Sequence, residues 1–229
     1  MRKIETASAV LIHRRAYRDS SLLLDFYTKE HGRVRLVGRG IRKSKTSIQM
    51  FQRLNISFSG KGELKTLTQW EIDDSPREIK GGTLILCIYI NELISVLVHD
   101  NDPHPELFDI YIDFINVIAS LNNNQQLWLL RLFESNMLSE LGYGLDYRID
   151  LNGNEIDENK NYEYRQHLGF DEKIDGKISG KLLGSLVSSD LESLPDEGML
   201  KVCRNLNRER LNLLLGNKKI RSRELFFVS

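Results

Sequence analysis

"HGRVRLVGRGIRKSKTS" (residues 31–47) is dense in Lys and Arg and contains no Asp or Glu. Its first half, "GRVRLVG" (32–38), alternates arginine with aliphatic residues, which is the period of a strand with one buried face. Its second half, "RGIRKSKTS" (39–47), keeps the positive charge but loses the alternation. We therefore predict a half-buried basic strand that runs into a flexible basic loop, a shape able to follow a phosphate backbone.

Four more segments before Gly81 have the composition of short strands. They are rich in apolar and β-branched residues and are bounded by turn or charged residues. They read "ASAVLIH" (7–13), "SLLLDFYT" (21–28), "LNISFSG" (54–60) and "ELKTLTQW" (63–70). Five strands with a long connection between the third and the fourth predict an OB-fold, a small Greek-key barrel. An SH3-like barrel has a similar number of strands and is the alternative.

The hydrophobic period changes after Gly81-Gly82. Apolar residues recur at helical spacing through 83–99, 101–121 and 125–142, and two further helices are expected near 177–189 and 197–215. Between them, the sequence loses its period and is rich in Asn, Asp, Glu and Gly. We predict an α+β protein with two domains, an OB-fold over 1–80 and an α-helical domain over 81–229 with an irregular segment near 146–176.

Charge is distributed unevenly along a chain whose formal net charge is zero. Residues 1–80 hold 17 Lys/Arg against 9 Asp/Glu, a net charge of +8. Residues 81–170 hold 4 against 14, a net charge of −10, and residues 171–229 hold 11 against 9, a net charge of +2. This separation indicates that the N-terminal part meets a polyanion while the middle does not.

The predicted barrel places basic residues where OB-folds bind their ligands, across strands two and three and in the loops between strands one and two and strands four and five. We expect the side chains of Arg33 and Arg35 on an exposed strand face, and Tyr17 as a stacking ring. The predicted nucleic-acid-binding residues are Arg14, Arg15, Tyr17, Arg18, Arg33, Arg35, Arg39, Arg42, Lys43, Lys45, Lys61 and Lys65. The alternative is a solvated basic face that has no partner.

A second basic cluster lies in "GNKKIRSRELF" (216–226), at Lys218, Lys219, Arg221 and Arg223. It either continues the nucleic-acid track or only complements the negative end of the preceding helix. The sequence does not decide between these two roles.

Catalytic and metal-binding patterns are weak. The segment "HDNDPHPELFD" (99–109) could be imagined as a metal site, but prolines and acidic residues together are also typical of a helix start. No catalytic motif has its required spacing, so we expect a protein that is not an enzyme and that has no cofactor and no metal.

Cys87 and Cys203 are expected to be buried thiols in a reducing compartment, and the apolar runs are too short to cross a bilayer. The sequence thus predicts a cytoplasmic protein that has no membrane partner.

Five segments, in order over nearly the whole chain, resemble the RecO family of bacterial DNA repair proteins. They are "YRDSSLLLDFYTKEHGRVRLVGRGIRKSKT", "GKGELKTLTQWE", "YINELISVLVHDNDPHPELFDIY", "LRLFESNMLSELGYGLDY" and "LLLGNKKIRSRELF". The resemblance implies an N-terminal OB-fold and a C-terminal helical domain. It further implies a non-enzymatic, nucleoid-associated protein of DNA recombination that binds single- and double-stranded DNA and anneals complementary strands. Such proteins work with RecR and help to load RecA on strands coated by the single-stranded DNA-binding protein, SSB.

The resemblance also implies a contact with the acidic C-terminal tail of SSB, which ends in apolar residues, on the helical domain. Arg131 is the candidate for that contact, and its alternative role is a helix-surface ion pair with Glu134. Many members of the family carry a four-cysteine zinc site after "LGYGLD", but the corresponding stretch here, 147–170, has no cysteine. The chain therefore resembles the zinc-free branch, in which we expect packing alone to hold this segment.

Two other functions remain open from the sequence. One is an RNA-binding OB-fold module of the translation apparatus, and a preference for single-stranded DNA together with strand annealing would argue against it. The other is a protein adaptor, for which DNA binding would be absent or independent of salt.

Overall fold

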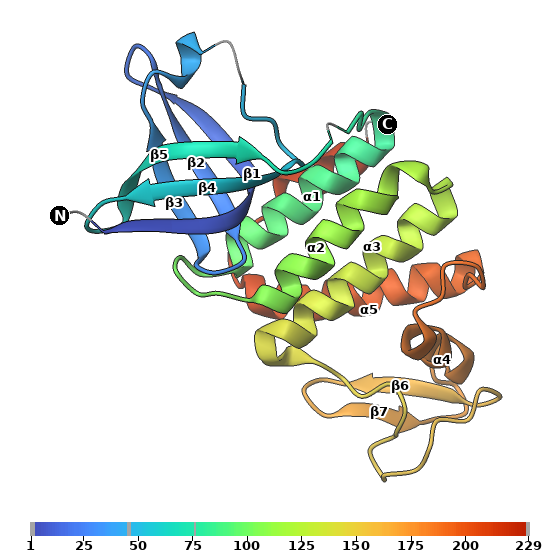
Figure 1. Ribbon diagram of the computed structural model, residues 1–229. Coiled ribbons are helices and arrows are strands. Elements are labelled where there is room, and N and C mark those ends of the chain that lie inside the picture. The colour runs from blue at the N-terminus through green and yellow to red at the C-terminus, as the bar shows by residue number, and fades with distance from the viewer. Residues whose placement is uncertain (1–2, 45–46, 76, 228–229) are drawn as a thin grey trace. The chain divides into compact units, whose positions relative to one another are not determined.

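The computed structural model describes residues 3–44, 47–75 and 77–227 of the chain (Figure 1). The chain forms two compact units. The first comprises the chain up to Ala119 and again from Asn217, and the second comprises Ser120–Gly216. The change from strands to helices near residue 80 is as predicted, but the compact units do not divide there, because two helices and the C-terminal segment pack with the barrel.

The first unit contains a closed five-stranded barrel. Its strands are β1 (Ile4–Tyr17), β2 (Ser21–Thr28), β3 (Gly32–Gly38), β4 (Arg53–Ser59) and β5 (Leu64–Ile72). They are ordered β1-β2-β3-β5-β4, and β3 and β5 are the parallel pair that closes the barrel. This is the predicted OB-fold, with the long connection after the third strand.

The first strand is longer than predicted and serves both halves of the barrel. Its N-terminal half pairs with β4, from Ile4 opposite Ser59 onward. Its C-terminal half pairs with β2, and the register shifts between Leu11 and His13. Such an irregularity bends a strand, so that one strand can turn from one partner to another.

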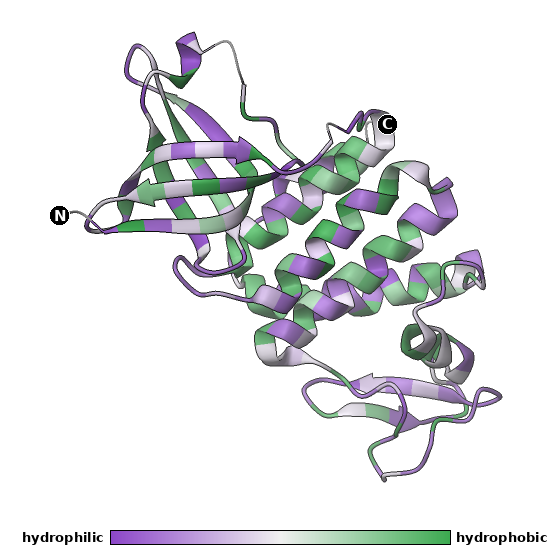
Figure 2. Ribbon diagram, viewed as in Figure 1, coloured by the Kyte–Doolittle hydropathy of each residue, from purple (hydrophilic) through white to green (hydrophobic). Residues whose placement is uncertain are grey.

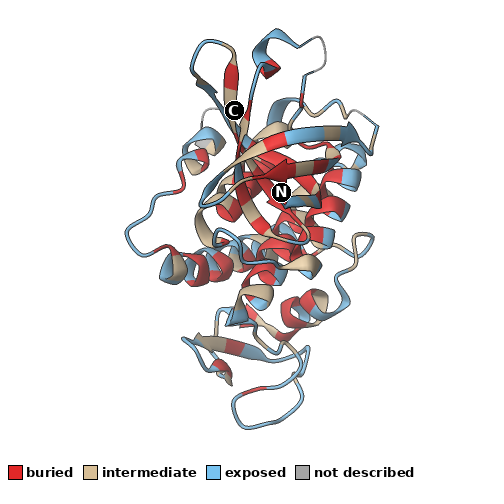
Figure 3. Ribbon diagram, turned by 60° about the vertical axis from the view of Figure 1, so that its left-hand side comes forward, coloured by how far each residue is buried: buried red, intermediate tan, exposed pale blue. Residues whose placement is uncertain are grey.

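Alternation of side chains builds the barrel core. The inward-facing residues include Leu11, Leu24, Phe26, Leu36 and Phe58, none of which exposes any side-chain surface. Hydrophobic and polar residues alternate along the strands in Figure 2, and Figure 3 shows the same strands alternating between buried and exposed residues. The packed interior leaves the outer faces and the loops of the barrel for contacts with other molecules.

Two helices of the first unit, α1 (Gly81–Leu97) and α2 (Pro105–Val117), cover the barrel. The ring of Tyr27 on β2 lies 5.5 Å from that of Phe108 and 6.1 Å from that of Tyr111. Gly32 begins β3 at φ +61, and a Cβ there would stand 2.1 Å from the carbonyl oxygen of Asp102. Only glycine allows the α1–α2 loop to come this close to the barrel.

Three short helical turns complete the first unit. They are η1 (Ile41–Lys43), η2 (Ile118–Ser120), which ends at the boundary between the units, and η4 (Arg221–Phe227). The Glu92 carboxylate of α1 accepts hydrogen bonds from the backbone N–H groups of Arg221 and Ser222, at 2.9 and 2.8 Å. This contact ties the C-terminal segment to α1. No helix in the described part of the chain is both long and apolar enough to cross a membrane.

The second unit packs three helices with a small sheet. Its elements are α3 (Asn123–Leu138), the π-helical turn η3 (Ser139–Tyr143), β6 (Asn161–Arg165), β7 (Gly169–Glu172), β8 (Ile178–Ser179), α4 (Gly180–Ser188) and α5 (Glu197–Leu215). A capping box between Asn122 and Gln125 starts α3. The core contains Trp128, Tyr162, Phe170 and Cys203. The two C-terminal helices lie close to their predicted ranges.

The segment predicted to be irregular, 146–176, contains two strands of a three-stranded antiparallel sheet ordered β7-β6-β8. The expectation that packing alone holds it is wrong. The buried Asp150 carboxylate accepts backbone N–H bonds from Asn152 and Asn154, both at 2.8 Å, and a side-chain bond from Asn154 at 3.1 Å. Tyr162 accepts a further bond, 2.9 Å long, from the backbone of Asp157. Side-chain hydrogen bonds to the backbone therefore fix the turns of this segment.

Candidate nucleic-acid interface

The basic residues predicted for the loop between strands one and two lie mainly on a strand. Arg14, Arg15 and Tyr17 belong to β1, where they pair with Leu24, Leu23 and Ser21 of β2. Only Arg18 lies in the turn. The prediction placed them in a loop because the apolar alternation ends at His13, whereas the β1–β2 hairpin continues as an arm with exposed side chains.

The turn of this hairpin and the segment after β3 lie together. Gly38 at the end of β3 pairs with Leu22, and the backbone N–H of Arg42 in η1 donates to the carbonyl of Ser20 at 3.1 Å. The Arg42 guanidinium donates to the carbonyl oxygens of Arg18 and Asp19, each at 3.2 Å. Figure 1 shows η1 beside the β1–β2 hairpin at the top of the view. Two stretches that β2 and β3 separate in the sequence therefore form one surface.

We call this surface the hairpin-end basic cluster. It comprises Arg14, Arg15, Arg18, Arg39, Arg42 and Lys43, all of them exposed. Within the described residues, no carboxylate lies at ion-pair distance from any member. Arg14 also donates to the Ile48 carbonyl at 3.0 Å, which fixes the connection to β4. Exposed positive charge that no neighbour neutralises is available to an anion.

The two arginines of β3 are in a different situation. The Arg33 side chain is 16% exposed, donates to the backbone carbonyl of Ser95 and forms an ion pair with Asp100. The Arg35 side chain is 44% exposed and pairs with Asp100 at 3.0 Å and with Asp25 at 3.6 Å. The expectation of an exposed position is confirmed for Arg35 and wrong for Arg33. Both guanidinium groups are paired, because the α1–α2 loop brings Asp100 onto this part of β3.

The remaining predicted barrel residues also include one that is paired with a carboxylate and one that is exposed. The Lys65 side chain is 16% exposed, and its ammonium group lies 3.0 Å from the Glu5 carboxylate and 5.0 Å from the Phe58 ring centroid. Lys61 is exposed in the β4–β5 turn. Lys45 lies outside the described residues. Of the twelve predicted residues, the structure brings six into the hairpin-end basic cluster, with Tyr17 beside them.

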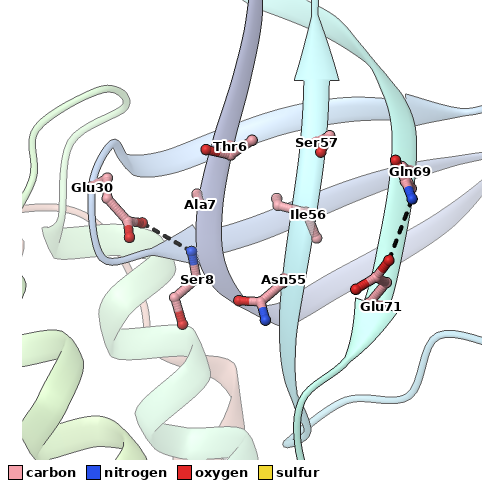
Figure 4. A pocket seen from close by; sticks show the side chains of 9 residues that line it. All are labelled: Thr6, Ala7, Ser8, Glu30, Asn55, Ile56, Ser57, Gln69 and Glu71. Carbon is pink, nitrogen blue, oxygen red and sulfur yellow. Dashed lines mark hydrogen bonds between the residues drawn. The ribbon is translucent and has the colours of Figure 1, made fainter.

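A hollow of about 300 Å³ on the outer face of β1, β4 and β5 has the opposite character (Figure 4). Hydroxyl and amide side chains and the carboxylates of Glu30 and Glu71 line it, and no Lys or Arg does. Figure 4 shows Glu30 bonded to the Ser8 backbone and Glu71 bonded to Gln69. Its carboxylates would repel phosphates, so this face is poorly suited to a nucleic-acid backbone.

Arg131 lines a groove of about 570 Å³ in the second unit, between α3 and the start of α5. Its guanidinium pairs with Glu134 at 2.9 Å, and the Asn207 amide donates to Glu134 at 3.2 Å and to the Arg131 carbonyl at 2.9 Å. The ion pair is present, as the alternative held, but it is buried, since the Arg131 side chain is 9% exposed. Arg131 therefore forms part of the wall of a groove.

Sequence reasoning missed the other residues of this groove. Leu127 and Leu200 supply apolar surface, and the exposed Lys201 and Arg204 supply positive charge. The signal was available, because positions 127 and 131, and 200 and 204, are each four residues apart and share a helix face. The sequence does not show that α3 packs against α5, so it could not predict that these two helix faces line the same groove.

The C-terminal basic cluster has a structural role in part. Lys218 donates to the Val96 carbonyl at 3.3 Å, and the Arg223 guanidinium lies 6.0 Å from the Tyr89 ring centroid. Lys219 and Arg221 are exposed. The cluster thus anchors the C-terminal segment to α1, while Lys218, Lys219 and Arg221 all remain exposed.

Neither cysteine takes part in a reactive site. Both thiols are free and buried, as predicted, and burial raises the pKa of each to about 12. They therefore stay protonated and weakly nucleophilic at neutral pH. Among the described residues, the segment 99–109 and the rest of the chain bring together no group of three or more His, Cys, Asp or Glu side chains fit to hold a metal.

Comparison with known proteins agrees with this architecture. A family model described as "Recombination protein O N terminal" matches residues 1–76, and one described as "Recombination protein O C terminal" matches residues 81–190. The DNA repair protein RecO of Pseudoalteromonas translucida (strain TAC 125) is 35% identical over 225 residues, which cover 96% of each chain. RecO of Enterobacter sp. (strain 638) is 34% identical over 95% of this chain and 94% of its own, and RecO of Proteus mirabilis (strain HI4320) is 34% identical over 95% and 90%. With an OB barrel, a helical C-terminal region and relatives matched over nearly their whole length, the chain belongs to the RecO family of DNA repair proteins.

Proposed function

We propose that this protein binds the sugar-phosphate backbones of single- and double-stranded DNA through the hairpin-end basic cluster. The observation that carries the proposal is that Arg42 bonds to the turn of the β1–β2 hairpin, and that these two stretches carry six exposed cations with no carboxylate paired to them among the described residues. Arginine suits this role because its fork of N–H groups matches the oxygens of a phosphate. Backbone contacts supply affinity and carry no direct information on sequence.

Strand annealing follows from the same surface. Two complementary strands repel each other, and a cationic surface lowers that repulsion by neutralising phosphates. Because the cluster contacts backbones, the hydrogen-bonding edges of the bases stay free to pair. The proposed function is that of a recombination mediator. In this proposal the protein is not an enzyme and needs no cofactor and no metal.

The groove of the second unit fits the proposed contact with SSB. An acidic tail that ends in apolar side chains requires apolar walls and a cationic rim. Leu127 and Leu200 provide the first, and the exposed Lys201 and Arg204 provide the second. Arg131 forms part of the wall, and the carboxylates of Asp196 and Glu197 line the groove as well. Membership of the RecO family supports the rest of the proposal, which is cooperation with RecR and assistance to RecA on strands coated by SSB.

A salt titration tests DNA binding. Each phosphate neutralised on a single strand contributes about −0.7 to the slope of log K against log salt. Replacing Arg15, Arg39 and Lys43 by Gln removes three candidate contacts, so the slope should flatten by about 2 and the affinity at 0.1 M salt should fall about 100-fold. Fluorescence anisotropy with a labelled oligonucleotide measures both quantities.

The matched control is a triple Gln variant at Lys177, Lys181 and Arg208, which are exposed residues of the second unit. It loses the same formal charge and should keep the wild-type slope. Equal losses in the two variants, or a wild-type slope near zero, would show that the cluster is not the DNA interface. Tighter binding of RNA than of DNA would instead favour a function on RNA.

The tail contact needs its own test, because Arg131 is buried and its removal would disturb the ion pair with Glu134. We expect Gln at both Lys201 and Arg204 to weaken binding of an SSB-tail peptide and to leave DNA binding unchanged. A double Gln variant at Lys177 and Lys181 is the control. Unchanged peptide affinity in the first variant would remove this groove from the proposal.

A further inference from the structure

The turn of the β1–β2 hairpin holds a residue in an uncommon backbone conformation. Arg18 has φ +51, in the left-handed region that residues other than glycine seldom adopt. Arg42 stabilises this turn through the two guanidinium bonds to the carbonyls of Arg18 and Asp19 and through its backbone bond to Ser20. The position of Arg18 is therefore set by contacts from a separate segment, which follows β3 in the chain.

This backbone brings the Arg18 side chain over its neighbour. The guanidinium carbon of Arg18 lies 5.1 Å from the centroid of the Tyr17 ring. At this distance the ring attracts the cation, and the contact limits the freedom of an otherwise mobile side chain. Tyr17 is half-buried, whereas Arg18 is exposed and lies within ion-pair distance of no carboxylate among the described residues. The ring of Tyr17, which we predicted as a stacking surface, is thus covered, and the planar guanidinium of Arg18 lies at the surface instead.

We propose that Arg18, held over Tyr17, is a stacking surface for one nucleobase of single-stranded DNA, and that Arg42 is its positioning residue. The inference rests on the proposed DNA binding by the hairpin-end basic cluster and deepens it. Guanidinium planes stack on bases, and every base offers a π face, so the contact would be tolerant of sequence. Bases inside a duplex are already stacked, so this platform would favour single strands over double strands.

The competing role for Arg18 is one more phosphate contact, and the two roles respond differently to lysine. Arg18→Lys keeps the positive charge and removes the planar group. The probes are a dT oligonucleotide and an abasic phosphodiester strand of the same length, both measured with the full chain. A stacking role predicts a loss of about tenfold on the dT strand, little change on the abasic strand or on a blunt duplex, and an unchanged salt slope.

Two further variants isolate the platform. Arg15→Lys makes the same chemical change at a cluster residue outside the turn, and it should affect the dT and abasic strands equally. Tyr17→Leu removes the ring at no cost in charge and should reproduce the selective loss on the dT strand, whereas Tyr17→Phe should not. Thermal unfolding verifies that each variant is folded.

The outcomes separate the inference from the proposed function. If Arg18→Lys changes both strands alike, or neither, while the wild-type protein binds DNA with a steep salt slope, the DNA interface stands and the platform is excluded. If the wild-type protein binds neither the dT strand nor the abasic strand, the proposed function fails and the platform fails with it. A selective loss on the dT strand in Arg18→Lys and Tyr17→Leu establishes the platform.

Discussion

Arg33 and Arg35 of β3 lie within ten residues of Arg39 and Arg42 of the hairpin-end basic cluster, yet different groups surround the two pairs. Arg33 and Arg35 face Asp100, which the α1–α2 loop brings to the barrel from a distant part of the sequence. Arg39, four residues further on, has no carboxylate at ion-pair distance among the described residues. Each arginine counts equally in the positive charge of the sequence, and only those of the cluster offer that charge freely to a ligand.

The difference separates two uses of an arginine. A guanidinium that is mostly buried and paired stabilises the fold, because its removal leaves its partners without their hydrogen bonds. An exposed, unpaired guanidinium contributes little to stability and can bind an anion. Substitutions in the two regions should therefore affect different measurements, and the following predictions test this division.

The largest effect on stability is expected from Arg33→Gln. This change leaves the Ser95 carbonyl without its charged donor and removes one of the two arginines that pair with Asp100. We expect the first unit to lose about 2–3 kcal/mol in free energy of unfolding, since a hydrogen bond to a charged group contributes about 1.5–3 kcal/mol. Urea denaturation measures the loss. The slope of DNA binding against salt should not change, and a flatter slope would place Arg33 in the interface after all.

Asp100→Asn changes the acidic partner of the β3 arginines and should make them more like the arginines of the hairpin-end basic cluster. The amide can still accept a bond from Arg33 but no longer neutralises Arg33 and Arg35, so we expect a cost of about 1–2 kcal/mol in unfolding free energy. Arg35 keeps only its longer pair with Asp25, at 3.6 Å, and because its side chain is already 44% exposed it becomes available to a phosphate. One additional contact on a single strand raises the affinity about fivefold at 0.1 M salt. An anisotropy titration that shows no gain would mean that β3 lies away from the path of the DNA.

These two regions also show what the sequence could predict. The alternation of "GRVRLVG" and the glycines around it depend on local preferences, so β3 was placed at its observed bounds, Gly32–Gly38. The pairing of Arg33 with Asp100 depends on the fold of the α1–α2 loop over Gly32, which no local pattern contains. For the same reason Lys65 was predicted as a ligand of DNA, although Glu5 on the neighbouring part of the barrel neutralises it.

The second unit gives a similar lesson about short elements. Its strands β6, β7 and β8 have five, four and two residues, too few to show an alternating pattern against a polar background. The Asp and Asn residues that made the segment look irregular are the ones that form its turns. Polar composition was read as a lack of structure, whereas side-chain bonds to the backbone supply that structure.

Asp150 allows this point to be tested by pH. Burial alone would raise the pKa of its carboxyl group, but the hydrogen bonds from Asn154 and Asn152 outweigh burial and lower the pKa below its ordinary value. A group whose pKa is lower in the folded state stabilises that state above its unfolded pKa, about 3.9, and loses this contribution as the pH falls through its folded pKa. The free energy of unfolding of the second unit should therefore decline as the pH falls below about 4. Asp150→Asn should show less of this decline, and an identical pH profile in both proteins would contradict the assignment.

The smallest expected effects come from a matched pair of single substitutions, Arg15→Gln and Arg35→Gln. Each removes one positive charge from an exposed arginine on a strand of the barrel. Arg15 has no carboxylate at ion-pair distance among the described residues, so its loss should change the free energy of unfolding by no more than about 0.5 kcal/mol and should lower the DNA affinity about fivefold at 0.1 M salt. Arg35 pairs with Asp100 and Asp25, and because these pairs are partly exposed, its loss should cost up to about 1 kcal/mol in stability. Its removal should leave the affinity within about twofold, because the charge it carries is already balanced. Equal losses of affinity in the two variants would show that overall charge, and not the unpaired state of the hairpin-end basic cluster, determines DNA binding.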